Sequence, residues 1–291
     1  MTFSFKVKEE LCKIENKKIC CDKAQCYASL LFLKFFFGKK SLHSEHKSVL
    51  RLLAEKLSIL TNCIIEIKMN DKRKINSLSL SSIDDYRSIT DFFNQENKEI
   101  ELLNLVCDNC RTAFLRGVFL ACGTISDPKK QYKLEFSISE KELSESFETF
   151  LKNSTSISFK KTKRRETYVF YTKDSSSIED FLTLIGATNS SMELMQEKMY
   201  KEATNRINRQ ANFETANIDK TITASANQIA CIMKIAQAKG WDFFEKDLSE
   251  VAACRIDNPE MSLKNIAEKL CMSRSSINHK LNKIIRLAEK I

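Results

Sequence analysis

Proline and glycine are scarce in this chain, with 2 Pro and 5 Gly among 291 residues. Both residue types interrupt helices and shape turns, so their scarcity predicts a helix-rich protein with few long loops. The longest strongly apolar run, residues 28–38, is too short to span a bilayer and contains Lys34. No apolar signal segment stands at the N-terminus. We therefore expect a cytoplasmic protein whose 11 cysteines are free thiols and not a disulfide framework.

Length and charge set the next limits. A chain of 291 residues has room for about two domains with a well-buried core. Lys and Arg number 47 against 38 Asp and Glu, which gives a formal net charge of +9. An excess of this sign favours a polyanionic partner such as nucleic acid.

Residues 262–291 have the pattern of a helix-turn-helix. Ser262 is placed to cap a short helix, in which apolar residues recur at helical spacing up to Leu270. Residues 271–273 form the expected turn, although position 271 holds Cys where such motifs usually carry Gly. Ser273 is placed to cap a second, longer helix, whose apolar stripe runs from Ile277 to Ala288.

The opposite face of this second helix is polar and basic and carries no acidic residue. From residue 262 to the end there are seven Lys or Arg against two Glu, a local excess of five. A helix of this kind fits the major groove of DNA with its N-terminal residues against the bases. The predicted DNA-binding residues are Lys264, Ser273, Arg274, Ser275, Ser276, Asn278, His279, Lys280, Asn282, Lys283 and Arg286. The alternative is an ordinary helical hairpin with a solvated polar face.

An internal repeat organises the first two thirds of the chain. Residues 115–123, L-R-G-V-F-L-A-C-G, correspond to residues 30–38, L-L-F-L-K-F-F-F-G, and each copy predicts an apolar helix end closed by glycine. The second copy is followed by a predicted strand, a turn at Asp127-Pro128, a strand at 132–138, a helix at 140–152, strands near 155–161 and 166–172, and a helix near 176–185. The first copy is followed by a predicted helix at 45–60, strands near 63–69 and 76–82, and a helix at 84–94. Two such halves predict an α+β domain with pseudo-twofold symmetry.

The stretch 115–123 resembles the signature helix of LAGLIDADG homing endonucleases. Joined to a C-terminal helix-turn-helix, it resembles the WhiA family of bacterial regulators of sporulation and cell division. Other stretches that match the family, in its order, are 4–11, 20–24, 113–128, 212–221, 262–270 and 276–281. The resemblance implies a pseudo-twofold LAGLIDADG homing-endonuclease-like N-terminal domain joined to an all-α helix-turn-helix domain.

We expect three parts along the chain. A LAGLIDADG-like domain at 1–189 has halves of about 1–104 and 105–189, a linker helix follows at 190–217, and a helix-turn-helix DNA-binding domain occupies 218–291. The linker helix is expected to be polar over 190–212, and the first helix of the C-terminal domain to run from about Thr221 to Lys239. The order of the four C-terminal helices resembles region 4 of bacterial sigma factors.

The same signature argues against an enzyme. In a LAGLIDADG nuclease the residue before the final glycine of each helix is acidic, and the two carboxylates hold the metal ions. Here those positions are Cys122 and Phe37, neither of which is a hard oxygen ligand. We therefore expect no catalytic residue, no cofactor and no small-molecule substrate. The short K-K-S-L-H-S segment after Gly38 also predicts a shortened or missing strand hairpin in the first half.

Two further patterns remain open to more than one interpretation. The pair Cys107-x-x-Cys110 together with Cys20 and Cys21 suggests a zinc site. This spacing gives it weak support, and small apolar residues at helix starts are the favoured interpretation, so no metal ligand is predicted. The basic run K-K-T-K-R-R at 160–165 fits contact with DNA phosphates and a solvated hairpin tip equally well.

The leading hypothesis is a sequence-specific DNA-binding regulator of cell division, chromosome segregation and, in sporulating bacteria, sporulation. Its expected partners are double-stranded promoter DNA in the nucleoid and a second regulatory protein or RNA polymerase, with no membrane. Base readout is assigned to the helix that starts at Arg274, and phosphate contact to Lys264, Lys280, Lys283 and Arg286. The alternatives are a nucleoid-associated scaffold protein with little sequence preference, or a LAGLIDADG endonuclease.

Overall fold

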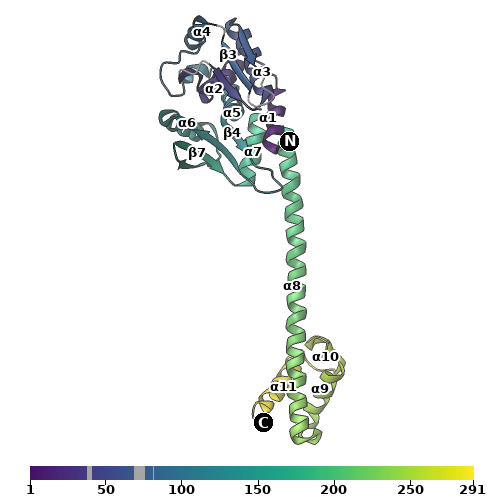
Figure 1. The fold of residues 1–291 in the computed structure, drawn as a ribbon. Helices are drawn as coiled ribbons and strands as arrows, with labels where there is room; N and C mark the ends of the chain where they lie inside the picture. Colours follow the sequence, from purple (N-terminus) through teal and green to yellow (C-terminus); the bar gives the residue numbers. More distant parts are fainter. Residues whose placement is uncertain (38–40, 69–75, 81) are drawn as a thin grey trace. The chain divides into compact units, whose positions relative to one another are not determined.

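The computed structural model describes residues 1–37, 41–68, 76–80 and 82–291. The chain divides into two compact units, Met1–Lys201 and Glu202–Ile291. Figure 1 follows the chain from its N-terminus in purple to its C-terminus in yellow. Each unit has its own hydrophobic core and is described by itself.

The first half of the first unit combines helices with a small sheet. Its elements are α1 (Phe3–Cys12), α2 (Ile19–Phe32), the 3-10 helix η1 (Phe35–Phe37), β1 (Ser41–Ser44), α3 (Lys47–Thr61), β2 (Ile65–Lys68), β3 (Asn76–Leu80), α4 (Ile83–Phe93) and the 3-10 helix η2 (Leu102–Asn104). The three strands are antiparallel in the order β1-β3-β2, with Leu78 of β3 opposite both Leu42 and Ile67.

The second half repeats this plan with a larger sheet. Its elements are α5 (Asp108–Cys122), β4 (Gly123–Ile125), β5 (Leu134–Ile138), α6 (Lys141–Ser154), β6 (Lys160–Arg164), β7 (Thr167–Thr172) and α7 (Ser175–Ile185). The antiparallel order is β4-β5-β7-β6. Phe136 of β5 anchors the core, where its ring meets those of Phe119, Phe147, Phe159 and Phe181.

The two halves meet along α2 and α5, and β3 lies on the opposite side of this helix pair from β4 and β7 (Figure 1). Gly117 of α5 allows the close approach. A Cβ at this position would overlap the carbonyl oxygen of Gln25 and lie 2.8 Å from the Cβ of Ala28. The hydroxyl of Ser29 donates to the carbonyl of Gly117 at 3.3 Å. The pseudo-twofold α+β arrangement expected from the repeat is therefore confirmed.

The two copies of the repeat differ at the ends of their helices. α5 continues to Cys122, and Gly123 begins β4, as expected. The expectation of a matching helix end in the first copy is wrong, because α2 stops at Phe32 and Lys34 adopts a left-handed φ of 67°. Burial of Phe35 explains the break, since its ring packs 4.9 Å from that of Tyr86. Gly38 itself lies outside the described residues.

Two further predictions concern strands, and the start of one predicted strand is wrong. In the described part of the first half, one strand, β1, stands between α2 and α3, where the second half has both β4 and β5. This agrees with the predicted shortening of the hairpin. The strand expected near 155–161 begins only at Lys160, because residues 155–159 have no partner strand and serve instead to bury Phe159 against Phe136 and Phe181.

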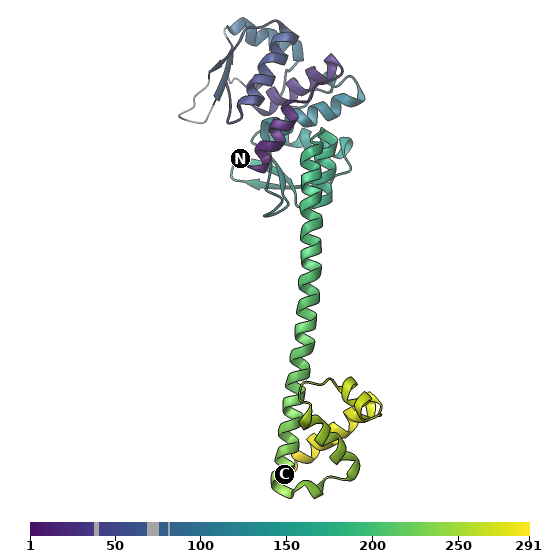
Figure 2. The ribbon, with the colours of Figure 1, turned by 90° about the vertical axis from the view of Figure 1, so that its right-hand side faces the viewer.

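The second unit is all helical. It contains the C-terminal part of α8 (Thr188–Lys239), the 3-10 helix η3 (Trp241–Phe243), α9 (Lys246–Asp257), α10 (Leu263–Lys269) and α11 (Arg274–Ala288). Figure 2 shows the last three helices gathered beside the end of α8. We expected the helix at 190–212 to be separate from that at 221–239, but α8 is continuous. Residues 213–220 contain neither Pro nor Gly, so nothing in this segment interrupts the helix.

Candidate nucleic-acid interface

The helix-turn-helix predicted from the sequence is present as α10 and α11. The Oγ atom of Ser262 accepts a hydrogen bond from the backbone N–H of Asn265 at 3.3 Å and caps α10. The Oγ atom of Ser273 accepts from the N–H of Ser276 at 3.1 Å and caps α11. Both helices therefore begin at the serines that the sequence indicated.

The turn between the helices depends on one left-handed residue. Cys271 has a φ of 53°, a conformation that glycine adopts more easily than cysteine. Its N–H donates to the carbonyl of Glu268 at 3.2 Å, and the N–H of Met272 donates to that of Ala267 at 2.9 Å. These two bonds close α10 in the way a glycine at this position would, so the turn forms despite the Cys side chain.

A small hydrophobic core determines which side of α11 faces inward. Ile277, Leu281 and Ile284 are buried on the inner side of the helix and pack in one cluster with Ile266 and Ala267 of α10. Ala267 is small enough for α10 and α11 to approach closely. Because the inner side is held in this way, the opposite side of α11 is presented to solvent as a rigid surface.

The exposed side of α11 carries most of the predicted DNA-binding residues. Arg274, Ser275, Asn278 and His279 are all exposed within the first two turns, and Asn282 and Arg286 continue the same face. Residues 202–291 are all described, and within them Arg274 and Arg286 form no ion pair. Two guanidinium groups and several amide, imidazole and hydroxyl groups are thus available to an external partner.

Three of the predicted lysines are already paired within the unit. Lys264 lies 3.8 Å from Glu268 and Lys283 lies 2.9 Å from Glu245, and both pairs are well exposed. Such pairs are worth little and exchange readily for a phosphate. Lys280 differs, because its side chain is only 17 % exposed and lies 3.5 Å from Asp247. It is therefore the predicted phosphate ligand that the structure presents least well.

A groove of about 360 Å³ lies beside the start of α11. It is lined by Lys220, Thr221, Ala224, Gln228, Arg255, Ser262, Leu263, Lys264 and Arg274. We did not predict the part contributed by Lys220, Gln228 and Arg255, because these residues precede α11 by tens of positions. The sequence did contain one indication of this part of the groove, because Lys220 and Thr221 end the stretch 212–221 that matches the family pattern.

The floor of this groove contains a buried cation. Arg255 is 1 % exposed, and its Nη1 donates to the carbonyl of Met261 at 2.7 Å and to the hydroxyl of Ser225 at 3.4 Å. Burial lowers its pKa, but a guanidinium remains charged in proteins. The Nε of Arg255 and the Oε1 of Gln228 have no hydrogen-bond partner in this fully described unit. The groove therefore combines three positive charges near its rim with unsatisfied polar atoms below.

The first unit offers no comparable surface at the positions where a LAGLIDADG nuclease carries its acids. Cys122 is partly buried at the end of α5, and burial raises the pKa of its thiol to about 12. Phe37 lies in η1. The Nζ atom of the buried Lys8 donates to the carbonyl of Leu120 at 3.1 Å, close to Cys122. Burial lowers the pKa of Lys8, and any ammonium charge at this place would repel a divalent cation.

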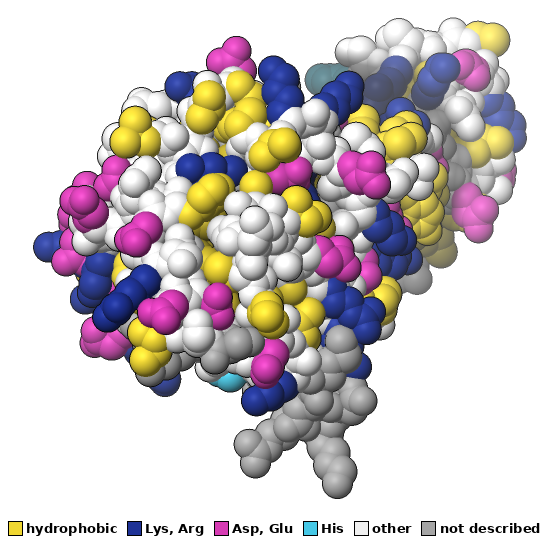
Figure 3. Space-filling view, turned by 90° about the horizontal axis from the view of Figure 1, so that it is seen from above, with side chains coloured by type: hydrophobic (Ala, Val, Ile, Leu, Met, Phe, Trp, Pro, Cys, Tyr) yellow, Lys and Arg dark blue, Asp and Glu magenta, His cyan; other side chains and the backbone are white. Residues whose placement is uncertain are grey.

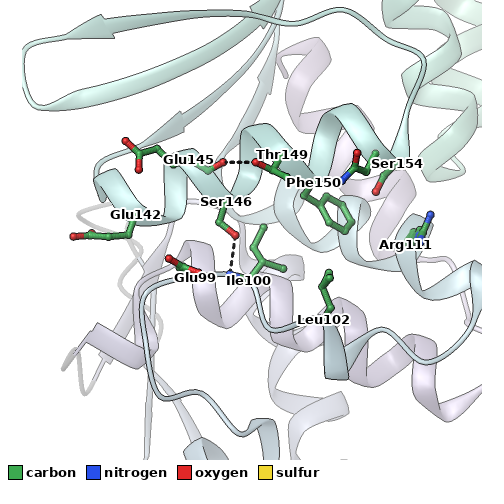
Figure 4. Close-up of a pocket in the computed structure, with 11 residues that line it drawn as sticks. Glu99, Ile100, Leu102, Arg111, Glu142, Glu145, Ser146, Thr149, Phe150 and Ser154 are labelled. Atoms are coloured by element: carbon green, nitrogen blue, oxygen red, sulfur yellow. Dashed lines mark hydrogen bonds between the residues drawn. The ribbon is translucent and has the colours of Figure 1, made fainter.

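A hollow of about 420 Å³ in the first unit is equally unsuited to DNA (Figure 4). Glu99, Glu142 and Glu145 lie along it against a single Arg111. The hydroxyl of Ser146 accepts from the N–H of Ile100 at 3.0 Å, so part of its polar lining is already satisfied. The space-filling view of the first unit shows Lys and Arg interspersed with Asp, Glu and hydrophobic side chains over the near face (Figure 3).

Most of the basic run at 160–165 lies in a strand, because residues 160–164 form β6, and only Arg165, with a φ of 52°, lies in the tip of the β6–β7 hairpin. β6 lies at the edge of its sheet and pairs with β7, and this pairing holds residues 160–164 in a strand. Lys161 lies 2.9 Å from Glu148, and Arg164 lies 3.6 Å from Glu135. Acidic neighbours thus offset part of the charge of this run.

Comparison with known proteins identifies both units. A family model described as the WhiA LAGLIDADG-like domain matches residues 111–204, and one described as the WhiA C-terminal HTH domain matches residues 207–288. The probable cell division protein WhiA of Clostridium botulinum is 32 % identical over 315 residues, covering 100 % of this chain and 99 % of that protein. This chain belongs to the WhiA family.

Other WhiA proteins support the assignment over the full length. The probable cell division protein WhiA of Caldicellulosiruptor bescii is 34 % identical over 317 residues, covering 100 % of this chain and 96 % of that protein. The crystal structure of full-length DUF199/WhiA from Thermotoga maritima matches with a TM-score of 0.58 and 26 % identity over 100 % of this chain and 99 % of that chain. The separate N-terminal LAGLIDADG domain of DUF199/WhiA shares the fold of 64 % of this chain, with a TM-score of 0.50, 22 % identity and 92 % of that domain covered.

Among the described residues, no helix combines the length and the apolar character needed to cross a membrane.

Proposed function

We propose that this WhiA-family protein is a sequence-specific DNA-binding regulator of cell division, chromosome segregation and, in sporulating bacteria, sporulation. The exposed face of α11 carries this proposal. It places Arg274, Ser275, Asn278 and His279 on a rigidly held helix start, without an acidic residue beside them. The names of the relatives, probable cell division proteins, support the biological process.

Base readout is assigned to the first two turns of α11. In a helix-turn-helix the N-terminal part of the second helix faces the base edges in the major groove. A guanidinium can bind the O6 and N7 atoms of guanine together, and an asparagine amide can bind the N6 and N7 atoms of adenine. Arg274 and Asn278 lie four residues apart and therefore on the same face, where both can reach neighbouring base pairs.

Phosphate contacts are assigned to the residues around this reading face. Lys283 and Arg286 lie two to three turns along α11 from Arg274, where the helix leaves the bases. The groove beside the helix start adds Lys220 and Lys264 to the buried charge of Arg255. We propose that this groove holds one backbone phosphate and so fixes the register of α11 on the duplex.

We also propose that the protein acts without catalysis. Cleavage by the homing-endonuclease mechanism needs two carboxylates around metal ions. Cys122 and Phe37 stand at those two positions, and Lys8 binds the end of α5 beside one of them. The first unit then serves as a scaffold and not as a nuclease.

The test begins with selection of preferred duplexes from random DNA by the full-length protein. Affinity for a selected duplex and for a random one is then measured over a range of salt. Arg274→Ala or Asn278→Ala is expected to cost about 1–3 kcal/mol on the selected duplex and to relax the preference. Lys283→Ala is expected to weaken both duplexes equally and to lower the salt slope by about one. Lys239→Ala, an exposed substitution about 16 Å along α8 from Gln228, is the control.

The scaffold alternative makes the opposite prediction. If α11 were only a basic handle, Arg274→Ala and Lys283→Ala would weaken selected and random DNA to the same degree. A selection experiment that returned no preferred sequence would lead to the same conclusion. Either outcome would contradict sequence-specific regulation and favour a nucleoid-associated scaffold.

A further inference from the structure

Four cysteine side chains converge at one end of the helix pair in the first unit. Cys20 and Cys21 lie in the first turn of α2, Cys107 is the N-cap of α5, and Cys110 lies in the first turn of that helix. Their four Sγ atoms all lie within 4.8 Å of one another. The pairs come from segments 87 residues apart, so the fold and not local sequence brings them together.

The spacing of these sulfurs matches a tetrahedral metal site. Zinc–thiolate bonds of about 2.3 Å at tetrahedral angles place neighbouring sulfurs about 3.8 Å apart. The Sγ atom of Cys107 lies 3.6 Å from that of Cys20, 3.7 Å from that of Cys21 and 3.5 Å from that of Cys110. The other Sγ–Sγ distances are at most 4.8 Å, so each must shorten by at most about 1 Å to reach the spacing of a tetrahedral site.

The surroundings favour thiolate ligands for a soft or borderline cation. Both pairs lie at the N-terminus of a helix, where the backbone dipoles stabilise negative charge. The N–H of Cys107 donates to the Sγ atom of Cys110 at 3.5 Å. Ala24, Ala113 and the partly buried Leu105 form an apolar shell around the sulfurs.

We propose that Cys20, Cys21, Cys107 and Cys110 bind one Zn²⁺ ion. Each thiol loses its proton to solvent as its sulfur binds the ion, and a closed set of four sulfurs leaves no position for a reacting water. The site is therefore structural. It joins the N-terminal ends of α2 and α5, and through them the two halves of the first unit. This role is independent of the DNA-binding function proposed for α11.

Simple apolar packing explains the cluster less well. Cys21 and Cys110 are buried, but Cys20 and Cys107 are partly exposed, and a small apolar residue gains little at such a place. A disulfide would link only two of the four sulfurs, and each of the three Sγ–Sγ distances from Cys107 exceeds the 2.05 Å of a disulfide bond by about 1.5 Å.

The first measurement is made on the full-length protein, purified anaerobically with a phosphine reductant that does not bind zinc. Elemental analysis is expected to find about one Zn²⁺ per chain. Replacement by Co²⁺ is expected to give the sulfur-to-cobalt charge-transfer bands and strong visible bands of a tetrahedral tetrathiolate site. This readout uses the unaltered protein, so it does not depend on the folding of any variant.

The second measurement uses serine variants. Cys107→Ser and Cys20→Ser are each expected to lower zinc affinity at least about tenfold in competition with a chromogenic chelator, since loss of even an outer partner of a metal ligand costs this much. Cys12→Ser in the first unit and Cys231→Ser in the second are matched controls, because both thiols are partly buried and lie outside the cluster. Both controls are expected to keep the metal.

Removal of zinc by a strong chelator is expected to lower the Tm of the first unit by roughly 5 °C or more, because the ion binds only the folded cluster. Four results would overturn the proposal. They are a protein without bound metal, a protein that contains iron in place of zinc, zinc that Cys107→Ser retains at unchanged affinity, and a Tm that does not respond to metal removal.

Discussion

Two basic segments of this protein look alike in the sequence and differ in the structure. The run at 160–165 holds five Lys or Arg among six residues, whereas α11 holds four over its fifteen. In β6, Lys161 and Arg164 lie close to the carboxylates of Glu148 and Glu135. In α11, Lys280 and Lys283 are likewise close to the carboxylates of Asp247 and Glu245, whereas Arg274 and Arg286 on the exposed face have no such partner within the second unit. The density of basic residues therefore does not distinguish the two segments; what sets α11 apart is two unpaired guanidinium groups on one exposed face of a helix.

The two units as a whole also differ in what their folds suggest and what their residues provide. The first unit has a fold that nucleases use for cutting DNA, but Cys122 and Phe37 stand at the acidic positions. The second unit is smaller, and its core serves to hold one helix with its polar face outward. Each unit has its own core, so we expect damage to one to leave the other folded.

The largest effect is expected from Ile277→Ala. Ile277 is fully buried beneath the reading face, and truncation of such a residue costs about 2–5 kcal/mol of unfolding free energy. The single tryptophan, Trp241, reports on this unit, because its ring lies 5.6 Å from that of the buried Phe244. Denaturant unfolding followed by tryptophan fluorescence measures the loss. Ile207→Ala, at a side chain 65 % exposed, is the control and is expected to change stability by less than about 0.5 kcal/mol.

A smaller effect, confined to the first unit, is expected from Gly117→Val. The new side chain would overlap the backbone of Gln25 and force α2 and α5 apart, at a cost of about 1–3 kcal/mol. Circular dichroism on heating measures this loss, and the tryptophan signal of the second unit is expected to stay unchanged. Arg111→Val, at an exposed position on the same helix, is the control. A parallel loss of stability in both units would contradict their independence.

The smallest effect is expected from Lys161→Ala and Arg164→Ala in β6. Because the proposed DNA contacts lie on α11 and its neighbouring groove and not on β6, affinity for a selected duplex is expected to change by no more than roughly twofold. Arg274→Ala, measured in the same titration, is expected to lower it about tenfold. If the β6 variants reduced affinity and salt slope as much as Lys283→Ala does, the first unit would also contact DNA, and the contrast between the two segments would fail.

Much of the second unit could be predicted because its signals are local. Ser262 and Ser273 cap the helices that their positions indicated, and the apolar stripe of α11 is buried as its spacing required. The groove beside α11 was missed, because Lys220, Arg255 and Arg274 come from three helices. The inward direction of Lys280 was also missed, since it depends on where Asp247 of α9 lies.

In the first unit, the sequence repeat predicted two similar halves but did not predict how the halves differ. The sequence of residues 30–38 reads as one apolar helix end, yet the burial of Phe35 against Tyr86 ends α2 early. Alternation at 155–159 suggested a strand, but a strand also needs a neighbour with which to share hydrogen bonds. Local propensity was therefore overruled at Phe35 by a side-chain partner distant in the chain, and at 155–159 by the lack of a partner strand.

By itself, the sequence determined the helix-turn-helix, its polar face and the absence of the nuclease carboxylates. Those features depend on residue identity and on spacing within one or two elements. The tertiary structure alone decided that Cys20 and Cys21 meet Cys107 and Cys110, and that Lys8 reaches the end of α5. The cysteines meet because α2 packs against α5 at Gly117, and Lys8 meets Leu120 because α1 also packs against α5, so atoms about ninety to more than a hundred residues apart in the chain are brought together.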